Sequence, residues 1–209
     1  MTESAVYFEN HARRSRFPWS LYHAELDRRI ARALAGLPPR PRVLVVGCGL
    51  DLIVPGRADA LVYGSDLDAR AIEACRGMFP SLDGRLATCP SEYEQPDFGV
   101  AFDAVVAKEV VEHVLDPGRW ARDLASRLDV GGLLVLTTPN YGRDSSLALL
   151  ERTVLEWVAR RDGYSRAHIH PTKFDRARLE RLDVGPSMRL VRVEVARTRW
   201  SLVGIWQRT

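Results

Sequence analysis

Cysteine and lysine are both scarce in this chain of 209 residues. Its three cysteines, Cys48, Cys75 and Cys89, are an odd number without metal-type spacing, which argues against a disulfide framework. Only Lys108 and Lys173 are lysines among the 30 basic residues, and the net charge is +3. Because phosphate binding normally shows a concentrated basic footprint, nucleic acid is not an expected partner.

Long apolar runs are missing as well. No segment approaches the ~18 apolar residues that a membrane helix needs. The first residues, MTESAVYFENHARRSRF, lack the apolar centre of a secretory signal peptide. We therefore expect a cytoplasmic protein without a membrane partner, and the length suits one α/β domain.

Short apolar runs alternate with helical segments along most of the chain. The runs lack strict polar alternation, which is typical of strands covered on both faces of a parallel sheet. This rhythm predicts a doubly wound α/β fold, whose ligands gather at the carboxyl ends of the strands. The expected strands are residues 42–46, 60–65, 84–88, 102–107 and 132–138, and the expected helices are residues 20–37, 68–79 and 117–129.

The last third of the chain has a different pattern. Residues 143–183 have mainly helical periodicity. Residues 188–198 and 199–209 alternate polar and apolar side chains, which predicts a short antiparallel strand pair at the sheet edge.

A glycine loop follows the first expected strand in the stretch RVLVVGCGLD, residues 42–51. Gly47 and Gly49, on either side of Cys48, allow backbone to approach a ligand without an intervening side chain. Asp66 ends the next expected strand, where a carboxylate can accept both hydrogen bonds of a ribose diol. Asp66 is alternatively a helix N-cap, but Asp68 is better placed for that cap.

The ligand of this loop is not expected to be a dinucleotide. A NAD-binding loop has a third glycine at the start of a long helix, which holds the pyrophosphate. Here Asp51 and Leu52 occupy that place, and Pro55 and Gly56 interrupt any helix. An aspartate would repel a pyrophosphate and tolerate a cation, which favours a sulfonium ligand.

Five segments in this order resemble class I S-adenosylmethionine-dependent methyltransferases, of the small-molecule group that includes ubiquinone-biosynthesis O-methyltransferases. They are VLVVGCG, VYGSDLDARAIEACR, FDAVVAKEVVEHVLDP, LDVGGLLVLTTPN and the closing strand pair. The resemblance implies a Rossmann-like, mainly parallel seven-stranded sheet with an antiparallel C-terminal pair and a helical roof. It also implies S-adenosylmethionine as cofactor, S-adenosylhomocysteine as its product, and a small-molecule acceptor.

The same resemblance assigns the cofactor-binding residues, with two departures from the family pattern. Val45 replaces an acid that in many relatives supports the methionine ammonium, and Asp51 is a candidate to supply that carboxylate instead. The acid that contacts adenine has no clear match, and Glu92 is the candidate. The predicted cofactor-binding residues are Gly47, Cys48, Gly49, Asp51, Asp66, Leu67, Glu92, Lys108 and Glu109.

Two histidines are candidate catalytic residues. His113 belongs to the stretch KEVVEHV after the fourth strand, and His170 lies in the insertion expected to roof the acceptor pocket. We expect both to face one cavity, where either could act as a general base. If residues 108–114 are helical, Glu109, Glu112 and His113 lie on one face. Some relatives bind a divalent ion through this Glu-x-x-Glu-His pattern, but a metal is not favoured here.

We expect one domain that methylates an oxygen or nitrogen of a small molecule. Its parts are a helical cap at 1–40, a cofactor-binding core at 41–140, a substrate-covering insertion at 141–183 and the strand pair at 184–209. Two alternatives stay open. One is metal-assisted 2′-O-methylation of RNA through Glu109, Glu112, His113 and His170, and the other is a cofactor-binding protein without catalysis.

Overall fold

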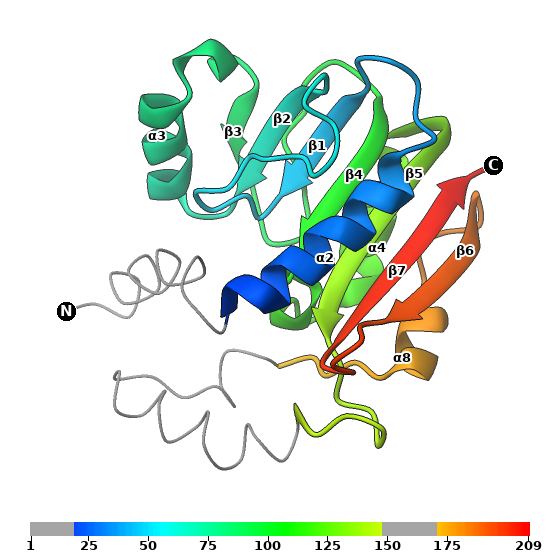
Figure 1. The fold of residues 1–209 in the computed structure, drawn as a ribbon. Coiled ribbons are helices and arrows are strands. Elements are labelled where there is room, and N and C mark those ends of the chain that lie inside the picture. The colour runs from blue at the N-terminus through cyan, green and yellow to red at the C-terminus, as the bar shows by residue number, and fades with distance from the viewer. Residues whose placement is uncertain (1–18, 148–170) are drawn as a thin grey trace.

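The computed structural model describes residues 19–147 and 171–209, and its centre is a seven-stranded sheet in the order β3-β2-β1-β4-β5-β7-β6 (Figure 1). β1 to β5 pair in parallel, whereas β7 is antiparallel to both of its neighbours. The predicted fold class is therefore confirmed. The strands are β1 (Arg42–Val46), β2 (Leu61–Asp66), β3 (Leu86–Thr88), β4 (Phe102–Lys108), β5 (Leu128–Pro139), β6 (Met188–Val195) and β7 (Ser201–Arg208).

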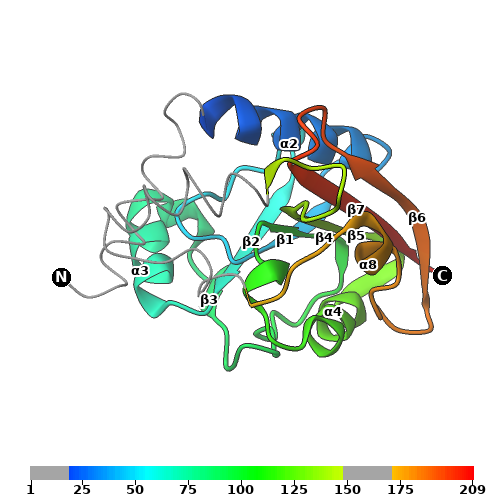
Figure 2. The ribbon, with the colours of Figure 1, turned by 90° about the horizontal axis from the view of Figure 1, so that it is seen from below.

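Helices cover both faces of the sheet, as the doubly wound pattern predicts. α2 and α3 lie over one face, and α4 and α8 lie over the other (Figures 1 and 2). Each face buries its own apolar cluster, centred on residues such as Val43 and Ile30 on the α2 side and Leu44 and Trp120 on the α4 side. The helical elements are α2 (Trp19–Leu34), α3 (Ala69–Met78), η2 (Pro80–Leu82), η3 (Val111–His113), α4 (Pro117–Ser126) and α8 (Arg176–Glu180).

β1 and β4 lie at the centre of the sheet. This position explains why their sequences do not alternate between polar and apolar residues. Residues 43–46 and 104–107 are all buried, because helices or loops cover both sides of these strands. β5 is longer than the predicted 132–138. It begins at Leu128, which pairs with Phe102, and a bulge follows before regular pairing resumes at Leu133.

The crossover from β1 to β2, residues 47–60, contains no helix. Parallel strands are usually joined through a helix. Because this crossover has none, α2 covers part of the sheet face over β1 and β4. α2 ends at Leu34 and not at the predicted residue 37. The guanidinium of Arg57, in the crossover loop, donates hydrogen bonds to the carbonyl oxygens of Leu34, at 3.1 Å, and Leu37, at 3.0 Å. The loop therefore caps the carboxyl end of α2.

The insertion predicted at 141–183 is described only in part. Residues 148–170, which include His170, lie outside the described residues. From residue 171 the chain returns to the sheet, where Phe174 forms a bridge with Asn140 at the end of β5. Across the ranges 19–147 and 171–209, none of the helices has the length and apolar character needed to span a membrane.

Candidate functional site

The glycine loop and Asp66 meet at the carboxyl edge of the sheet, as predicted. Gly47 and Gly49 follow β1 and both have left-handed backbone, with φ of 61° and 53°. Glycine adopts this conformation at little cost. A Cβ at Gly47 would also lie 2.6 Å from Cγ2 of Val110, so the loop is pressed against the segment that follows β4.

The carboxylate of Asp66 joins two loops. Oδ2 accepts a hydrogen bond of 2.8 Å from the backbone N–H of Gly49, and Oδ1 accepts one of 2.9 Å from Asp68. Two further lone-pair positions remain for a ligand, since a carboxylate has about four. Asp68 caps α3 through the N–H of Arg70, which confirms its predicted role. Leu67, between the two acids, is 59% exposed.

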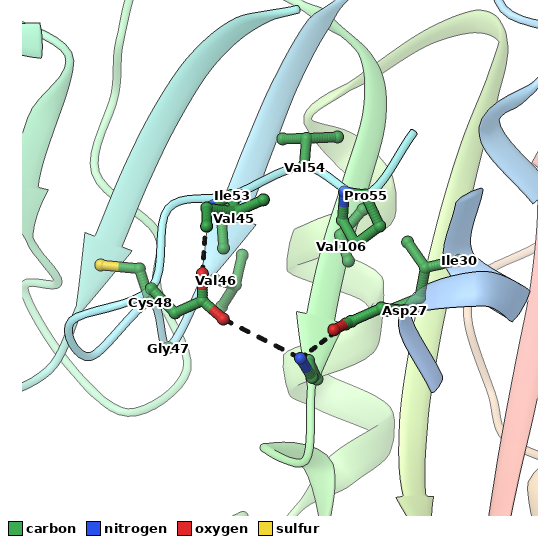
Figure 3. Close-up of a pocket in the computed structure, with 12 residues that line it drawn as sticks. Asp27, Ile30, Val45, Val46, Gly47, Cys48, Ile53, Val54, Pro55 and Val106 are labelled. Atoms are coloured by element: carbon green, nitrogen blue, oxygen red, sulfur yellow. Dashed lines mark hydrogen bonds and ion pairs between the residues drawn. The ribbon is translucent and has the colours of Figure 1, made fainter. Parts of the chain in front are cut away.

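A pocket that is open to solvent lies between α2 and the crossover loop (Figure 3). Its walls are largely apolar side chains from α2, β1, β4 and the loop, and three charged residues line it as well. Lys108 Nζ lies 2.6 Å from Asp27 Oδ1 and 3.9 Å from Asp51 Oδ2. The lining residues are Asp27, Ile30, Val45, Val46, Gly47, Cys48, Asp51, Ile53, Val54, Pro55, Val106 and Lys108.

Glu109 adopts an unusual backbone conformation beside this pocket. Its φ of 58° places a non-glycine residue in the left-handed region, which costs on the order of 1–3 kcal/mol. Hydrogen bonds hold it there. The carboxylate accepts from the Tyr22 hydroxyl at 2.7 Å and from the Thr137 hydroxyl at 3.0 Å, and the backbone N–H donates to Thr137 Oγ1 at 3.0 Å.

Tyr22 connects this network to the start of β7. Its phenol oxygen accepts a hydrogen bond of 2.5 Å from Ser201 Oγ while its proton goes to Glu109. Burial, and next the charge of Glu109, raise the pKa of Tyr22 well above 10. The phenol therefore stays protonated and can donate over the whole physiological pH range.

The segment after Glu109 does not form the continuous helix that would have placed Glu109, Glu112 and His113 on one face. Val111–His113 is a single 3₁₀ turn, so Glu109, Glu112 and His113 do not share one α-helical face. Glu112 is 1% exposed, and its Oε1 lies 4.0 Å from His113 Nε2. Within residues 19–147 and 171–209, no group of three or more His, Cys, Asp or Glu side chains is arranged to hold a metal ion.

His113 and Glu92 both lie at this edge of the molecule. The His113 side chain is 34% exposed. The chain after residue 170 contacts the 3₁₀ turn that contains His113, because the N–H of Thr172 donates a hydrogen bond of 3.1 Å to the carbonyl oxygen of Glu112. Glu92 Oε1 accepts the N–H of Leu115 at 3.0 Å, which connects the loop after β3 to the one after η3.

Sequence reasoning missed Asp27. The expected helix at 20–37 was correct in type, but the sequence pattern gave Asp27 no role. In the sequence Asp27 lies between Leu26 and Ile30, which are both buried, so it adjoins the buried face of the helix. This position was the one sequence feature that could have marked Asp27 as a pocket residue. Its partner Lys108 is 81 residues away in sequence, so the pair could not be read from spacing.

Comparison with known proteins supports the same picture. A family model described as "Methyltransferase domain" matches residues 18–182. A ubiquinone biosynthesis O-methyltransferase from Chelativorans sp. (strain BNC1) is 32% identical over 165 residues, which cover 74% of this chain and 62% of the relative. One from Bradyrhizobium sp. (strain ORS 278) is 35% identical over 144 residues, covering 65% and 54%. The chain thus spans less than two thirds of the length of these curated relatives.

Solved structures resemble the fold over nearly the whole chain. The magnesium protoporphyrin IX methyltransferase of Synechocystis PCC 6803, solved with bound SAH, has a TM-score of 0.68 at 18% identity and covers 99% of this chain and 95% of its own. An S-adenosylmethionine-dependent methyltransferase from Clostridium acetobutylicum has a TM-score of 0.70 at 11% identity, covering 98% and 99%.

Proposed function

The chain belongs to the methyltransferase domain family, and we propose that it transfers a methyl group from S-adenosylmethionine to an oxygen or nitrogen of a small-molecule acceptor. The contact between Asp66 and Gly49 carries the proposal. It places a carboxylate with free acceptor positions against a left-handed glycine loop, at the carboxyl edge of a doubly wound sheet.

The residues at this edge suit a cofactor that joins a nucleoside to a charged amino-acid end. Asp66 offers acceptors for the two hydroxyls of a ribose, and the exposed side chain of Leu67 offers an apolar surface beside it. The crossover loop carries Asp51, which suits a cationic ligand better than a pyrophosphate. Glu92 stays a candidate for the adenine amine, although one of its oxygens already accepts a backbone N–H.

When bound, the cofactor supplies a methyl group activated by a sulfonium. The contribution of the protein is then chiefly to hold the acceptor in line and exclude water. Glu109 and His113 follow β4 and are the candidate groups to orient an acceptor or take its proton. His170 remains a candidate partner for His113. The names of the curated relatives support an oxygen acceptor.

Two measurements test this function. Isothermal titration calorimetry with S-adenosylmethionine and S-adenosylhomocysteine tests the cofactor, and absence of binding would refute it. Incubation of the protein with cell extracts and a methyl-labelled donor, followed by identification of the labelled product, tests the transfer. Binding without any labelled product would favour a non-catalytic role.

The two histidines are tested on the identified acceptor. We expect replacement of His113 or His170 by alanine to lower turnover by ~10²–10⁴ if that residue is the base. Full turnover in the double variant would exclude both. Restoration of a chelator-treated enzyme by Mg²⁺ would instead revive the metal hypothesis.

A further inference from the structure

The central strand β1 offers no carboxylate to the pocket beside it. Val45, its fourth residue, is buried and pairs with Gly64 on one side and Val106 on the other. A positively charged group entering the pocket therefore needs its counter-charge from another element. Among the described residues that line the pocket, three side chains carry charge, namely Asp27, Asp51 and Lys108.

The arrangement of these three charges is specific. The Lys108 ammonium contacts Asp27 on α2 at 2.6 Å and lies 3.9 Å from Asp51 on the crossover loop. Lys108 has three N–H donors, so donors remain after its bond to Asp27. Each aspartate keeps acceptor positions as well. The cluster thus presents both a cation and two anions to one ligand.

A ligand end that carries both an ammonium and a carboxylate complements this cluster. Its ammonium would lie against Asp27 and Asp51, and its carboxylate would accept from Lys108. A purely anionic end would meet two carboxylates, and a purely cationic end would meet the Lys108 ammonium, so both match less well. The other described residues that line the pocket, such as Ile30 and Val106, are uncharged, so the ligand end finds no further charged partner among them.

We infer that Asp27, Asp51 and Lys108 form a clamp for the α-amino-acid end of S-adenosylmethionine, with Asp27 of α2 supplying the carboxylate that β1 lacks. This inference rests on the proposed function and assigns specificity to residues on three elements. Gly47 and Cys48 line the same pocket, and Gly49 of the same loop contacts Asp66. The clamp is therefore continuous with the proposed ribose site.

The clamp is built before a ligand binds, because α2 is fixed by contacts elsewhere. Arg29 donates to Glu194 of β6 at 2.6 Å, and Tyr22 donates to Glu109 at 2.7 Å. These contacts hold the helix on either side of Asp27 against the sheet. A preorganised site loses little conformational freedom on binding, so its charges contribute fully to affinity.

The test uses three ligands that share the nucleoside and differ at the other end. S-Adenosylhomocysteine carries the ammonium and the carboxylate, its decarboxylated analogue carries the ammonium alone, and 5′-methylthioadenosine carries neither. Their dissociation constants are measured by calorimetry for the wild type, Asp27→Asn, Asp51→Asn and Lys108→Met. Arg28→Met, on the exposed side of α2, and Asp129→Asn, at the other end of the sheet, are matched charge controls.

The expected losses depend on the sign of the charge that each variant removes. Asp27→Asn weakens S-adenosylhomocysteine and the decarboxylated analogue about 10- to 100-fold, because a charge-assisted contact is lost. Asp51→Asn has the same pattern with a smaller loss, since Asp51 is half exposed. Lys108→Met weakens S-adenosylhomocysteine alone to that extent. No variant changes the affinity of 5′-methylthioadenosine by more than about twofold, and neither control changes any of the three.

Several outcomes would overturn the clamp. One is an unchanged S-adenosylhomocysteine affinity in both Asp27→Asn and Lys108→Met. Another is an equal loss for all three ligands, which would indicate a structural role. A third is equal wild-type affinity for S-adenosylhomocysteine and 5′-methylthioadenosine. If the wild type binds none of the ligands, the proposed function fails together with the clamp. Circular dichroism checks folding, and Lys108→Gln, which also removes the charge and should give the same ligand pattern, replaces Lys108→Met if that variant does not fold.

Discussion

At the scale of single residues, Asp66 has two duties, because its carboxylate ties the glycine loop to β2 and is the proposed ribose acceptor. Asp66→Ala is expected to raise the dissociation constant of S-adenosylhomocysteine about 10- to 100-fold. It should weaken 5′-methylthioadenosine equally, since both ligands contain the ribose. The control Asp68→Ala removes the cap of α3, costs about 1 kcal/mol of stability and leaves affinity nearly unchanged. Calorimetry decides, and unchanged affinity in a folded Asp66→Ala would mean that another group binds the ribose.

Tyr22 makes a second prediction at this scale. Its folded-state pKa is raised by burial and by Glu109, so its contribution to stability is complete below pH ~10, the unfolded value, and is lost as the pH rises toward the folded value. Tyr22→Phe should lose about 1–2 kcal/mol at neutral pH, because Glu109 and Ser201 each lose a partner. Urea unfolding from neutral to alkaline pH should show a shallower alkaline decline for the variant. An identical decline would exclude Tyr22 as its source.

At the scale of elements, α2 is anchored to β6 and the turn after it by an ion-pair network. Burial alone would raise the pKa values of Glu25 and Glu194. Hydrogen bonds from the Arg197 N–H and from Arg29 outweigh burial and lower the pKa of Glu25. Hydrogen bonds from Arg192 and Arg29 do the same for Glu194. Lowered folded-state values mean stability that is present above pH ~4.5 and is lost as the pH falls through them. Arg29→Met should lose about 1–3 kcal/mol at neutral pH and show a smaller further loss in acid. Urea unfolding at both pH values checks this, and an acid loss equal to the wild type's would contradict it.

The glycine loop is an element whose position depends on the segment after β4. Gly47→Ala would place a methyl group 2.6 Å from Val110 Cγ2 and keep a left-handed φ of 61°. The expected loss is about 1–3 kcal/mol. Adding Val110→Ala should recover part of it, because the contact is relieved while the backbone strain stays. Thermal unfolding of both single variants and the double variant measures this coupling, and additive losses would show that Val110 is not the obstacle.

What the sequence could predict at this scale depends on how local each signal is. Val43 to Val46 form an apolar run, and Asp68 precedes a helical pattern, so strand and cap were both predictable. The crossover after Gly47 was correctly expected to lack a long helix because of Pro55 and Gly56. The single 3₁₀ turn at residues 111–113 was not predicted, since the left-handed Glu109 depends on Tyr22 and Thr137. Contacts of that kind join distant elements and have no spacing to detect.

At the scale of the whole molecule, the proposed cofactor site collects residues from α2, β1, β2 and β4 and so depends on the entire sheet. Apolar clusters on both faces hold these elements together. No single element can keep Asp27, Gly49 and Asp66 in place once the sheet opens. Ligand binding should therefore stabilise the domain as one unit, and not only the loops that touch the ligand.

The size of that stabilisation follows from mass action. S-Adenosylhomocysteine at 100 times its dissociation constant should add about 2.7 kcal/mol to the unfolding free energy. For a domain of this length that corresponds to a rise in Tm of roughly 5–11 °C. Asp27→Asn at the same ligand concentration should show a clearly smaller rise, because its affinity is lower. Calorimetric scans measure both, with Arg28→Met as control. A ligand that binds by titration yet leaves the Tm of the wild type unchanged would show that it also binds the unfolded chain, and the proposed site could not then require the folded sheet.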